Sequence, residues 1–267
     1  MGFPLAETGR RPGLESVLKP VLEPVLEPVL EPVLEPVLDL LYPRRCPLCE
    51  RLLCADEAYV CRDCEAVLPL VRHPMCLCCG KPLRNEYAEF CADCGRVRHR
   101  YDEGRAIFIY EKNMRRSVDR MKFHNHREYI PFYGASLARW GRPYLRRWQP
   151  DCIIPVPMHP RKRAQRGYDQ AVLLSRELSV RTGIELREDL LLRTRYTRAS
   201  RKLGRGSRRD NLRGAFSAGD CAMPPRLLLV DDIYTTGLTM DTASAVLRRA
   251  GAQEIYFLTL CTGVGQE

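Results

Sequence analysis

The chain has 267 residues, of which 45% are hydrophobic and 28% charged, and it carries a formal net charge of +10. This length suits one large domain or two smaller ones, with enough apolar residues for a buried core. The excess of Lys and Arg favours polyanionic partners, either a nucleic acid or a strongly anionic small molecule. No apolar run approaches the length of a membrane span, and no basic segment followed by an apolar core marks a secretory signal. We therefore expect a cytoplasmic protein without a membrane span.

The first 40 residues differ from the rest of the chain. A four-residue unit, VLEP with small variations, repeats from Val17 to Leu40. A proline every four residues removes helical hydrogen bonds and favours extended backbone at the preceding residue. We expect residues 1–40 to form a disordered or polyproline-like low-complexity arm. Its acidic residues leave two interpretations open: an expansion without function, or an arm that folds back on a basic surface.

Residues 41–100 are predicted to form a double zinc ribbon. The chain contains 13 cysteines, and eight of them form four C-x-x-C pairs arranged as two repeats. Thiolates at this spacing are typical of tetrahedral zinc in a reducing compartment, whereas iron–sulfur ligation usually has other spacings. The predicted ligands are Cys46, Cys49, Cys61 and Cys64 in the first repeat and Cys76, Cys79, Cys91 and Cys94 in the second. One structural zinc per repeat is the simple pairing, although interleaved ligands or the loss of one metal stay open.

Residues 101–267 alternate between strand and helix patterns, which predicts a parallel α/β sheet. Strands are predicted at 106–110, 151–157, 215–217, 227–230 and 254–261, and helices at 113–121, 128–147, 168–181 and 238–250. Asp169 is expected near the N-cap of the third of these helices. Basic segments accompany this region. The segment Lys112–Trp148 carries ten basic and two acidic side chains, and a basic cluster formed by His73, Arg96, Arg98, His99 and Arg100 flanks the cysteine repeats. The cluster is either a solvated surface or a set of phosphate contacts to nucleic acid.

The most informative stretch is Leu227–Gly237, in which four apolar residues end in Asp231 and Asp232 before a hydroxyl-rich loop. A strand, a tight loop and a helix start together make an anion site, because loop N–H groups and the positive end of the helix dipole converge there. Carboxylates at the strand end can hold sugar hydroxyls or hydrated Mg²⁺. The stretch predicts a cradle for a phosphorylated sugar. The alternative is an ordinary buried strand before a turn.

This stretch resembles the phosphoribosyl-pyrophosphate (PRPP) signature of type I phosphoribosyltransferases. With the cysteine repeats, the R-G-Y-D-Q segment at Arg166–Gln170 and the pattern Arg209, Asn211, Ala215 and Phe216, the chain resembles the ComF family from about Val37 to Gly263. The resemblance implies an α/β type I phosphoribosyltransferase fold, a twisted parallel sheet with helices on both faces, after the double zinc ribbon. It also implies a link with natural competence, the uptake and processing of transforming DNA.

The resemblance assigns a role to each site residue. Asp231 and Asp232 would be catalytic and hold the ribose hydroxyls of PRPP. The 5-phosphate would bind to Thr235, Thr236, Gly237, Leu238 and Thr239. The pyrophosphate would face Arg161, Lys162 and Arg163, which lie in a predicted loop after a strand, and Arg201, which belongs to a predicted mobile loop at 197–211. Mg²⁺ would bind together with PRPP.

Two functional hypotheses remain open at this stage. In the first, the chain is an enzyme, a phosphoribosyltransferase in which a nitrogen nucleophile, as yet unknown, displaces pyrophosphate from PRPP. In the second, it is a catalytically inactive adaptor that binds DNA or proteins of the competence machinery. Single-stranded DNA is an expected partner of the enzyme and of a DNA-binding adaptor, because the chain is strongly basic. In the remaining alternative, the zinc ribbons and the basic helices serve only a protein partner.

Overall fold

The computed structural model describes residues 43–196, 212 and 214–263, which form two compact units. The predicted arm at 1–40 and the predicted loop with Arg201 lie outside the described residues. One unit contains residues up to Leu68 together with Arg115–Phe132, and the other contains Pro69–Met114 together with the chain from Tyr133 on. The two cysteine repeats therefore belong to different units. The predicted domain boundaries at residues 40 and 100 stay predictions.

The first unit is built around the first cysteine repeat. A buried carboxylate, Glu57, accepts hydrogen bonds from the backbone N–H groups of Cys54 and Arg62, both at 2.9 Å, and from the Arg51 guanidinium at 2.8 Å. The bond to Arg62 lies at the start of helix α3 (Arg62–Ala66), whose N-cap residue is Cys61. Glu57 therefore holds the second C-x-x-C pair of this repeat against the chain that precedes it.

The second unit contains a five-stranded parallel sheet with the order β1-β7-β6-β2-β3. The strands are β1 (Glu103–Ile109), β2 (Cys152–Pro155), β3 (Glu185–Leu186), β6 (Arg226–Tyr234) and β7 (Glu254–Thr262). A small antiparallel pair, β4 (Leu191–Arg193) and β5 (Phe216–Ala218), stands apart from this sheet. The pairing confirms the predicted α/β fold, since all neighbouring strands of this sheet are parallel and no hairpin joins them.

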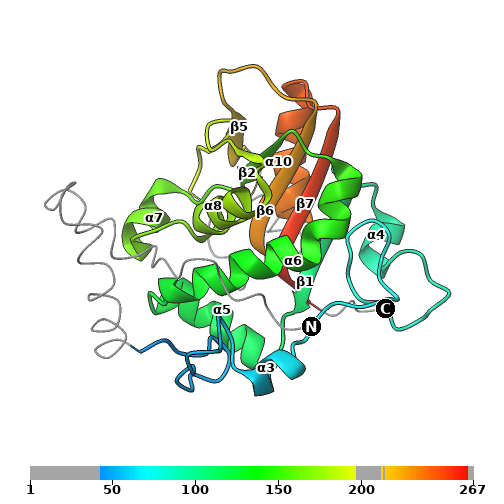
Figure 1. The fold of residues 1–267 in the computed structure, drawn as a ribbon. Coiled ribbons are helices and arrows are strands. Elements are labelled where there is room, and N and C mark those ends of the chain that lie inside the picture. Colours follow the sequence, from blue (N-terminus) through cyan, green and yellow to red (C-terminus); the bar gives the residue numbers. More distant parts are fainter. Residues whose placement is uncertain (1–42, 197–211, 213, 264–267) are drawn as a thin grey trace, which may run out of the picture. The chain divides into compact units, whose positions relative to one another are not determined.

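Helices cover both faces of this sheet (Figure 1). Helix α6 (Ile130–Trp148) lies on the face that Leu258 occupies, because a Cβ added at Gly141 would meet the Leu258 side chain at 2.8 Å. Helix α8 (Gln170–Thr182) packs against β2 and β6. On the opposite face, Phe257 of β7 shares a buried core with the second cysteine repeat. Leu247 of helix α10 (Leu238–Arg249) belongs to the same core. This repeat, which includes the short helix α4 (Ala92–Arg96), is thus part of the hydrophobic core of the sheet.

The segment after β2 differs from the prediction. It was expected to be a loop, but it forms helix α7 (Pro160–Arg166). Pro160 supplies the fixed φ of a first helical residue, and the Nδ1 atom of His159 accepts a hydrogen bond from the N–H group of Arg161 at 3.1 Å. Gly167, at φ +81°, ends the helix. No residue of α7 is buried, so the sequence has no apolar periodicity that would have indicated it.

The remaining helices agree with the prediction within a few residues. Helix α5 spans Lys112–Phe123, and a 3₁₀ turn, η1 (Arg127–Tyr129), precedes α6. Among the described residues, none of the helices combines the length and the apolar character that crossing a membrane requires.

Candidate functional site

The two predicted carboxylates lie at the carboxyl end of β6, the central strand of the sheet. Asp232 is 6% exposed and accepts a hydrogen bond from Nε2 of Gln170 at 2.7 Å. Asp231 is half-buried, and its Oδ1 atom accepts a hydrogen bond from the backbone N–H group of Asp232 at 2.8 Å. Arg166 in turn donates to Oε1 of Gln170 at 2.6 Å. A chain of hydrogen bonds therefore fixes the orientation of the Asp232 carboxylate.

The predicted phosphate-binding residues form the turn after β6 and the first two residues of α10, and we call them together the phosphate loop (residues 235–239). Gly237 is the N-cap of α10, at φ +78°, and no side chain caps the helix. The first-turn N–H groups of a helix have no partner within the helix, and they carry the positive end of its dipole. Thr235 is exposed, and Thr236 and Thr239 are half-buried. The structure thus places all five predicted residues around one uncapped helix start.

Asp169 connects the segment after β2 with the start of α8. Its Oδ1 atom accepts a hydrogen bond from the N–H group of Ala171 at 3.0 Å, which makes it the N-cap of α8 as predicted. Its Oδ2 atom accepts a hydrogen bond from the N–H group of Met158 at 2.7 Å. Burial raises the pKa of Asp169, although the backbone hydrogen bonds favour its ionised form. This residue positions the segment that carries the predicted pyrophosphate contacts.

The predicted pyrophosphate contacts are not equivalent. Arg161 and Arg163 are exposed, whereas Lys162 is half-buried, with its ammonium group 5.4 Å from the ring centroid of Tyr196. Burial, followed by the charges of Arg193 and Arg166, lowers the pKa of Lys162. Of these three basic residues of α7, Lys162 is the one that is partly withdrawn from solvent.

Arg193 is a candidate site residue that the sequence analysis missed. It lies at the end of β4, with its guanidinium 4.6 Å from the ring centroid of Phe216. Burial lowers the pKa of Arg193, and the charges of Asp231 and Asp169 oppose this shift. Arg193 therefore adds positive charge close to the carboxylates of the site. Its sequence context, the end of a short apolar run, contains no motif that would have indicated this role.

The cysteines of each repeat come together in one tetrad. Cys46, Cys49, Cys61 and Cys64 form the first tetrad, and Cys76, Cys79, Cys91 and Cys94 form the second, with the sulfur atoms of each within 4.8 Å of one another. One sulfur pair in each tetrad, Cys49–Cys61 and Cys79–Cys91, is separated by 3.7 Å. A tetrahedral zinc with Zn–S bonds of about 2.3 Å requires a separation of about 3.8 Å. The donors thus fit one zinc per repeat, and the cysteines of the described residues are all free thiols.

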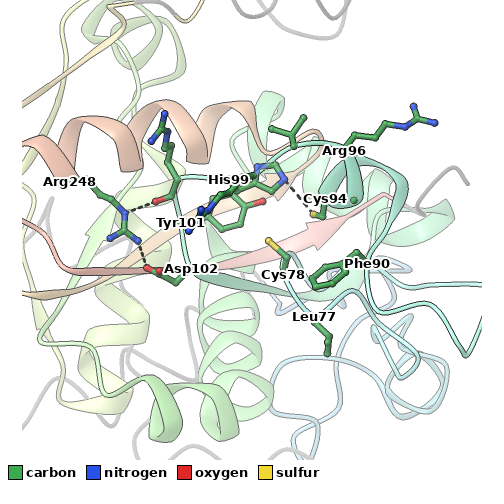
Figure 2. Close-up of a pocket in the computed structure, with 13 residues that line it drawn as sticks. Leu77, Cys78, Phe90, Cys94, Arg96, His99, Tyr101, Asp102 and Arg248 are labelled. Carbon is green, nitrogen blue, oxygen red and sulfur yellow. Dashed lines mark hydrogen bonds and ion pairs between the residues drawn. The ribbon is translucent and has the colours of Figure 1, made fainter.

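A cavity of ≈ 890 Å³ lies beside the second tetrad (Figure 2). Its walls include Phe90, Tyr101, His99 and the exposed residues Arg96 and Arg98. A further thiol, that of Cys78, lies within 4.8 Å of both Cys94 and His99. The cavity is therefore basic and partly aromatic, and it reaches the edge of the second tetrad.

Comparison with known proteins places these features in context. Residues 37–95 match the family model for a double zinc ribbon domain. The chain is 32% identical over 217 residues to competence protein F of Haemophilus influenzae. This alignment covers 79% of this chain and 93% of that protein. It is 27% identical over 216 residues to competence protein ComFC of Streptococcus pneumoniae, covering 78% and 90%. It is 26% identical over 226 residues to the DNA utilization protein YhgH of Escherichia coli, covering 83% and 98%.

Proposed function

Because the chain belongs to the competence protein F family, we propose that it binds PRPP with Mg²⁺ at the carboxyl end of β6 and acts in the uptake or use of DNA. The observation that carries the proposal is the pairing of Asp231 and Asp232 with the uncapped start of α10. An open sheet of parallel strands binds its ligands outside the carboxyl ends of the strands. The names of the relatives, which refer to competence and to DNA utilization, support the second half of the proposal.

The roles of the residues follow from their chemistry. The N–H groups of the phosphate loop and the hydroxyl groups of Thr235 and Thr236 would hold the 5-phosphate. The carboxylates of Asp231 and Asp232 would accept hydrogen bonds from the ribose 2- and 3-hydroxyls. Lys162 and Arg193 would face the pyrophosphate, because both carry positive charge that is partly withdrawn from water. Mg²⁺ bound with the substrate would neutralise part of the pyrophosphate charge.

The transfer step would exchange one bond for another at the anomeric carbon. A nitrogen nucleophile forms a bond to this carbon, and the carbon–oxygen bond to pyrophosphate breaks, with its electron pair leaving on the pyrophosphate. The carboxylates at the end of β6 would stabilise the positive charge that develops on the ribose ring. Among the residues that the structure describes, no group identifies the acceptor, and an adaptor that binds PRPP without turnover is the second candidate. Release of pyrophosphate from PRPP, measured with and without single-stranded DNA, distinguishes the enzyme, which releases it, from the adaptor, which does not.

We assign the nucleic-acid contact to the cavity beside the second tetrad. Arg96, Arg98 and Arg100 are exposed around it, and Phe90 is 48% exposed at its wall. Basic side chains that follow a strand backbone, together with an aromatic ring on which a base can stack, are typical of single-strand binding. The cavity combines both features.

Calorimetry with PRPP and MgCl₂ tests the small-molecule site. The unmodified protein is expected to bind PRPP, and the double variant Asp231→Asn, Asp232→Asn is expected to bind at least about tenfold more weakly, since it loses two charge-assisted hydrogen-bond acceptors. Asp189→Asn is the matched control, because this carboxylate is exposed and forms an ion pair with Arg187 outside the site. Absent binding by the unmodified protein, or equal binding by the double variant, would refute the assignment.

Fluorescence anisotropy with a labelled single strand, measured against salt concentration, tests the cavity. The slope of log affinity against log salt is expected to be about −0.7 for each phosphate contacted. Arg96→Ser with Arg98→Ser should make this slope less steep by about 1.4, which corresponds to two contacts. Arg142→Ser with Arg146→Ser removes the same charge from exposed positions of α6. Equal effects of the two pairs would show that the cavity is not the binding site.

A further inference from the structure

We propose that the second tetrad, with zinc bound, positions the phosphate loop through His99 and Tyr101. The proposal rests on the PRPP site proposed above and adds to it a set of positioning residues that come from the ribbon. His99 and Tyr101 follow the last cysteine of the second repeat, and both pack against residues of the β6–α10 turn. The ribbon would thus be part of the support of the PRPP site.

A continuous polar path joins the second tetrad to α10. The Sγ atom of Cys94 lies 3.4 Å from Nε2 of His99, and Nδ1 of the same ring lies 2.8 Å from Oδ2 of Asp241. Figure 2 shows the contact between Cys94 and His99 as a dashed line. The imidazole is buried, with 3% of its side chain exposed. Asp241 lies in the first turn of α10, and its N–H group donates to the carbonyl of Gly237 at 2.8 Å. Cys94 and Gly237 are therefore linked through two side chains.

This path determines the direction in which the Asp241 carboxylate points. A carboxylate in the first turn of a helix can interact with the uncapped N–H groups at the helix start, where it would compete with a bound phosphate. Here both of its oxygens are engaged elsewhere, Oδ2 with His99 and Oδ1 with the N–H group of Arg100 at 2.8 Å. The ribbon segment thus holds the one acidic side chain of this turn away from the proposed phosphate position.

An aromatic contact reinforces the polar path. The hydroxyl groups of Tyr101 and Tyr234 lie 2.7 Å apart, and Tyr101 stacks on His99 at 4.7 Å between ring centroids. Both tyrosines pack against Phe257, with centroid separations of 4.9 and 4.8 Å. Gly237 lies directly on this group, because a Cβ added there would meet the Tyr234 hydroxyl at 2.6 Å and Cε1 of His99 at 3.1 Å. The backbone of the phosphate loop therefore rests on residues that follow the second tetrad.

The last turn of α10 is bound to the same segment. The Nε atom of Arg248 donates to the carbonyl of Arg100 at 2.8 Å, and its Nη2 atom donates to Asp102 at 2.5 Å. Residues 99–102 are thus bonded to both ends of α10. Because the structure of a small cysteine ribbon depends on its metal, loss of zinc would release this segment from the tetrad.

The experiment compares the two tetrads. Cys79→Ser disrupts the second tetrad, and Cys49→Ser makes the same chemical change in the first tetrad, which belongs to the other compact unit. Each variant is expected to lose about one zinc per chain by metal analysis, since each tetrad holds one ion. PRPP affinity, measured by calorimetry, should fall at least about tenfold in Cys79→Ser and change less than about twofold in Cys49→Ser. Equal effects of the two substitutions would overturn the proposal.

A second set of variants keeps all tetrad cysteines. His99→Phe retains an aromatic ring beside Tyr101 but removes both hydrogen bonds of the imidazole. We expect unchanged zinc content and about three- to tenfold weaker PRPP binding. Adding Asp241→Asn to this variant should restore the affinity to within about twofold of the unmodified protein, because it removes the charge that His99 no longer holds. A loss of zinc in His99→Phe, unweakened binding, or absent restoration would overturn the proposal.

Hydrogen exchange of residues 235–241 without PRPP separates this proposal from the PRPP assignment. The amides of this segment should exchange faster in Cys79→Ser and in His99→Phe than in the unmodified protein, and Cys49→Ser should leave them unchanged. If the exchange follows this pattern but no variant binds PRPP, the ligand assignment fails and the positioning holds. If PRPP binds but exchange is equal in all proteins, the positioning fails.

Discussion

Gly237→Ala is expected to reduce the free energy of unfolding by about 2–3 kcal/mol. The residue has φ +78°, a left-handed conformation that costs an L-residue about 1–2 kcal/mol. In addition, the new methyl group would lie 2.6 Å from the hydroxyl of Tyr234, which is 2% exposed and stacked on Phe257. Displacing this hydroxyl breaks its hydrogen bond to Tyr101, with a net cost of about 1 kcal/mol. The two contributions add, because one is local strain and the other a tertiary contact.

The two contributions are separable by a matched control. Gly183 has φ +74° at the end of α8, and a Cβ added there meets no heavy atom within 4 Å. Gly183→Ala should therefore show the strain alone, about 1–2 kcal/mol. Urea unfolding at equilibrium in the presence of zinc gives both values by linear extrapolation. If the two variants lose equal stability, Gly237 is not packed tightly against Tyr234, and the argument for contact between ribbon and loop loses its basis.

Three further predictions concern the core, an ion pair and the metal. Phe257→Ala should cost about 3–5 kcal/mol in urea unfolding, because a fully buried ring between two tyrosines leaves a cavity. Burial opposes ionisation of Asp151, but the hydrogen bonds from Arg226 outweigh it and lower the pKa. The carboxylate therefore stabilises the fold above its unfolded pKa of about 3.9, and this contribution is lost as the pH falls through the lower folded pKa. The destabilisation caused by Asp151→Asn should thus be present at neutral pH and shrink in acid, and a difference that is constant with pH would contradict this. A strong zinc chelator should expose the eight tetrad thiols to a thiol reagent and lower the melting temperature, whereas unchanged thiol reactivity would argue against bound zinc.

The sequence was sufficient where function follows from local patterns. The spacing of the C-x-x-C pairs predicted which thiols assemble, and the structure groups them in chain order, one tetrad per repeat. Four apolar residues before Asp231 predicted a buried strand, which the structure places at the centre of the sheet, and Asp169 was predicted near the helix N-cap that it forms. These signals survive in the sequence because a strand, a cap and a metal knuckle are each specified by residues within a few positions of one another.

Helix α7 shows the limit of such patterns. Its seven residues bury no side chain, so it depends on a proline start, a histidine cap and a terminal glycine instead of on periodicity. Arg193 shows a different limit. Its place near the carboxylates depends on the pairing of β4 with β5, which brings together residues more than 20 positions apart.

The sequence by itself determined the local motifs: two groups of zinc-binding thiols, a strand ending in two carboxylates, and a glycine before a helix. Only the tertiary structure decided which residues of these motifs contact one another and which residues support them. Hydrogen-bond contacts join His99 to Asp241, 142 positions apart in the sequence, and Tyr101 to Tyr234, 133 positions apart. Another joins Gln170 to Asp232, 62 positions apart. No periodicity records such pairs, because they arise when a buried face of the sheet is packed against a ribbon and a helix that are distant in the chain. The second ribbon became a candidate support of the phosphate loop only through that packing.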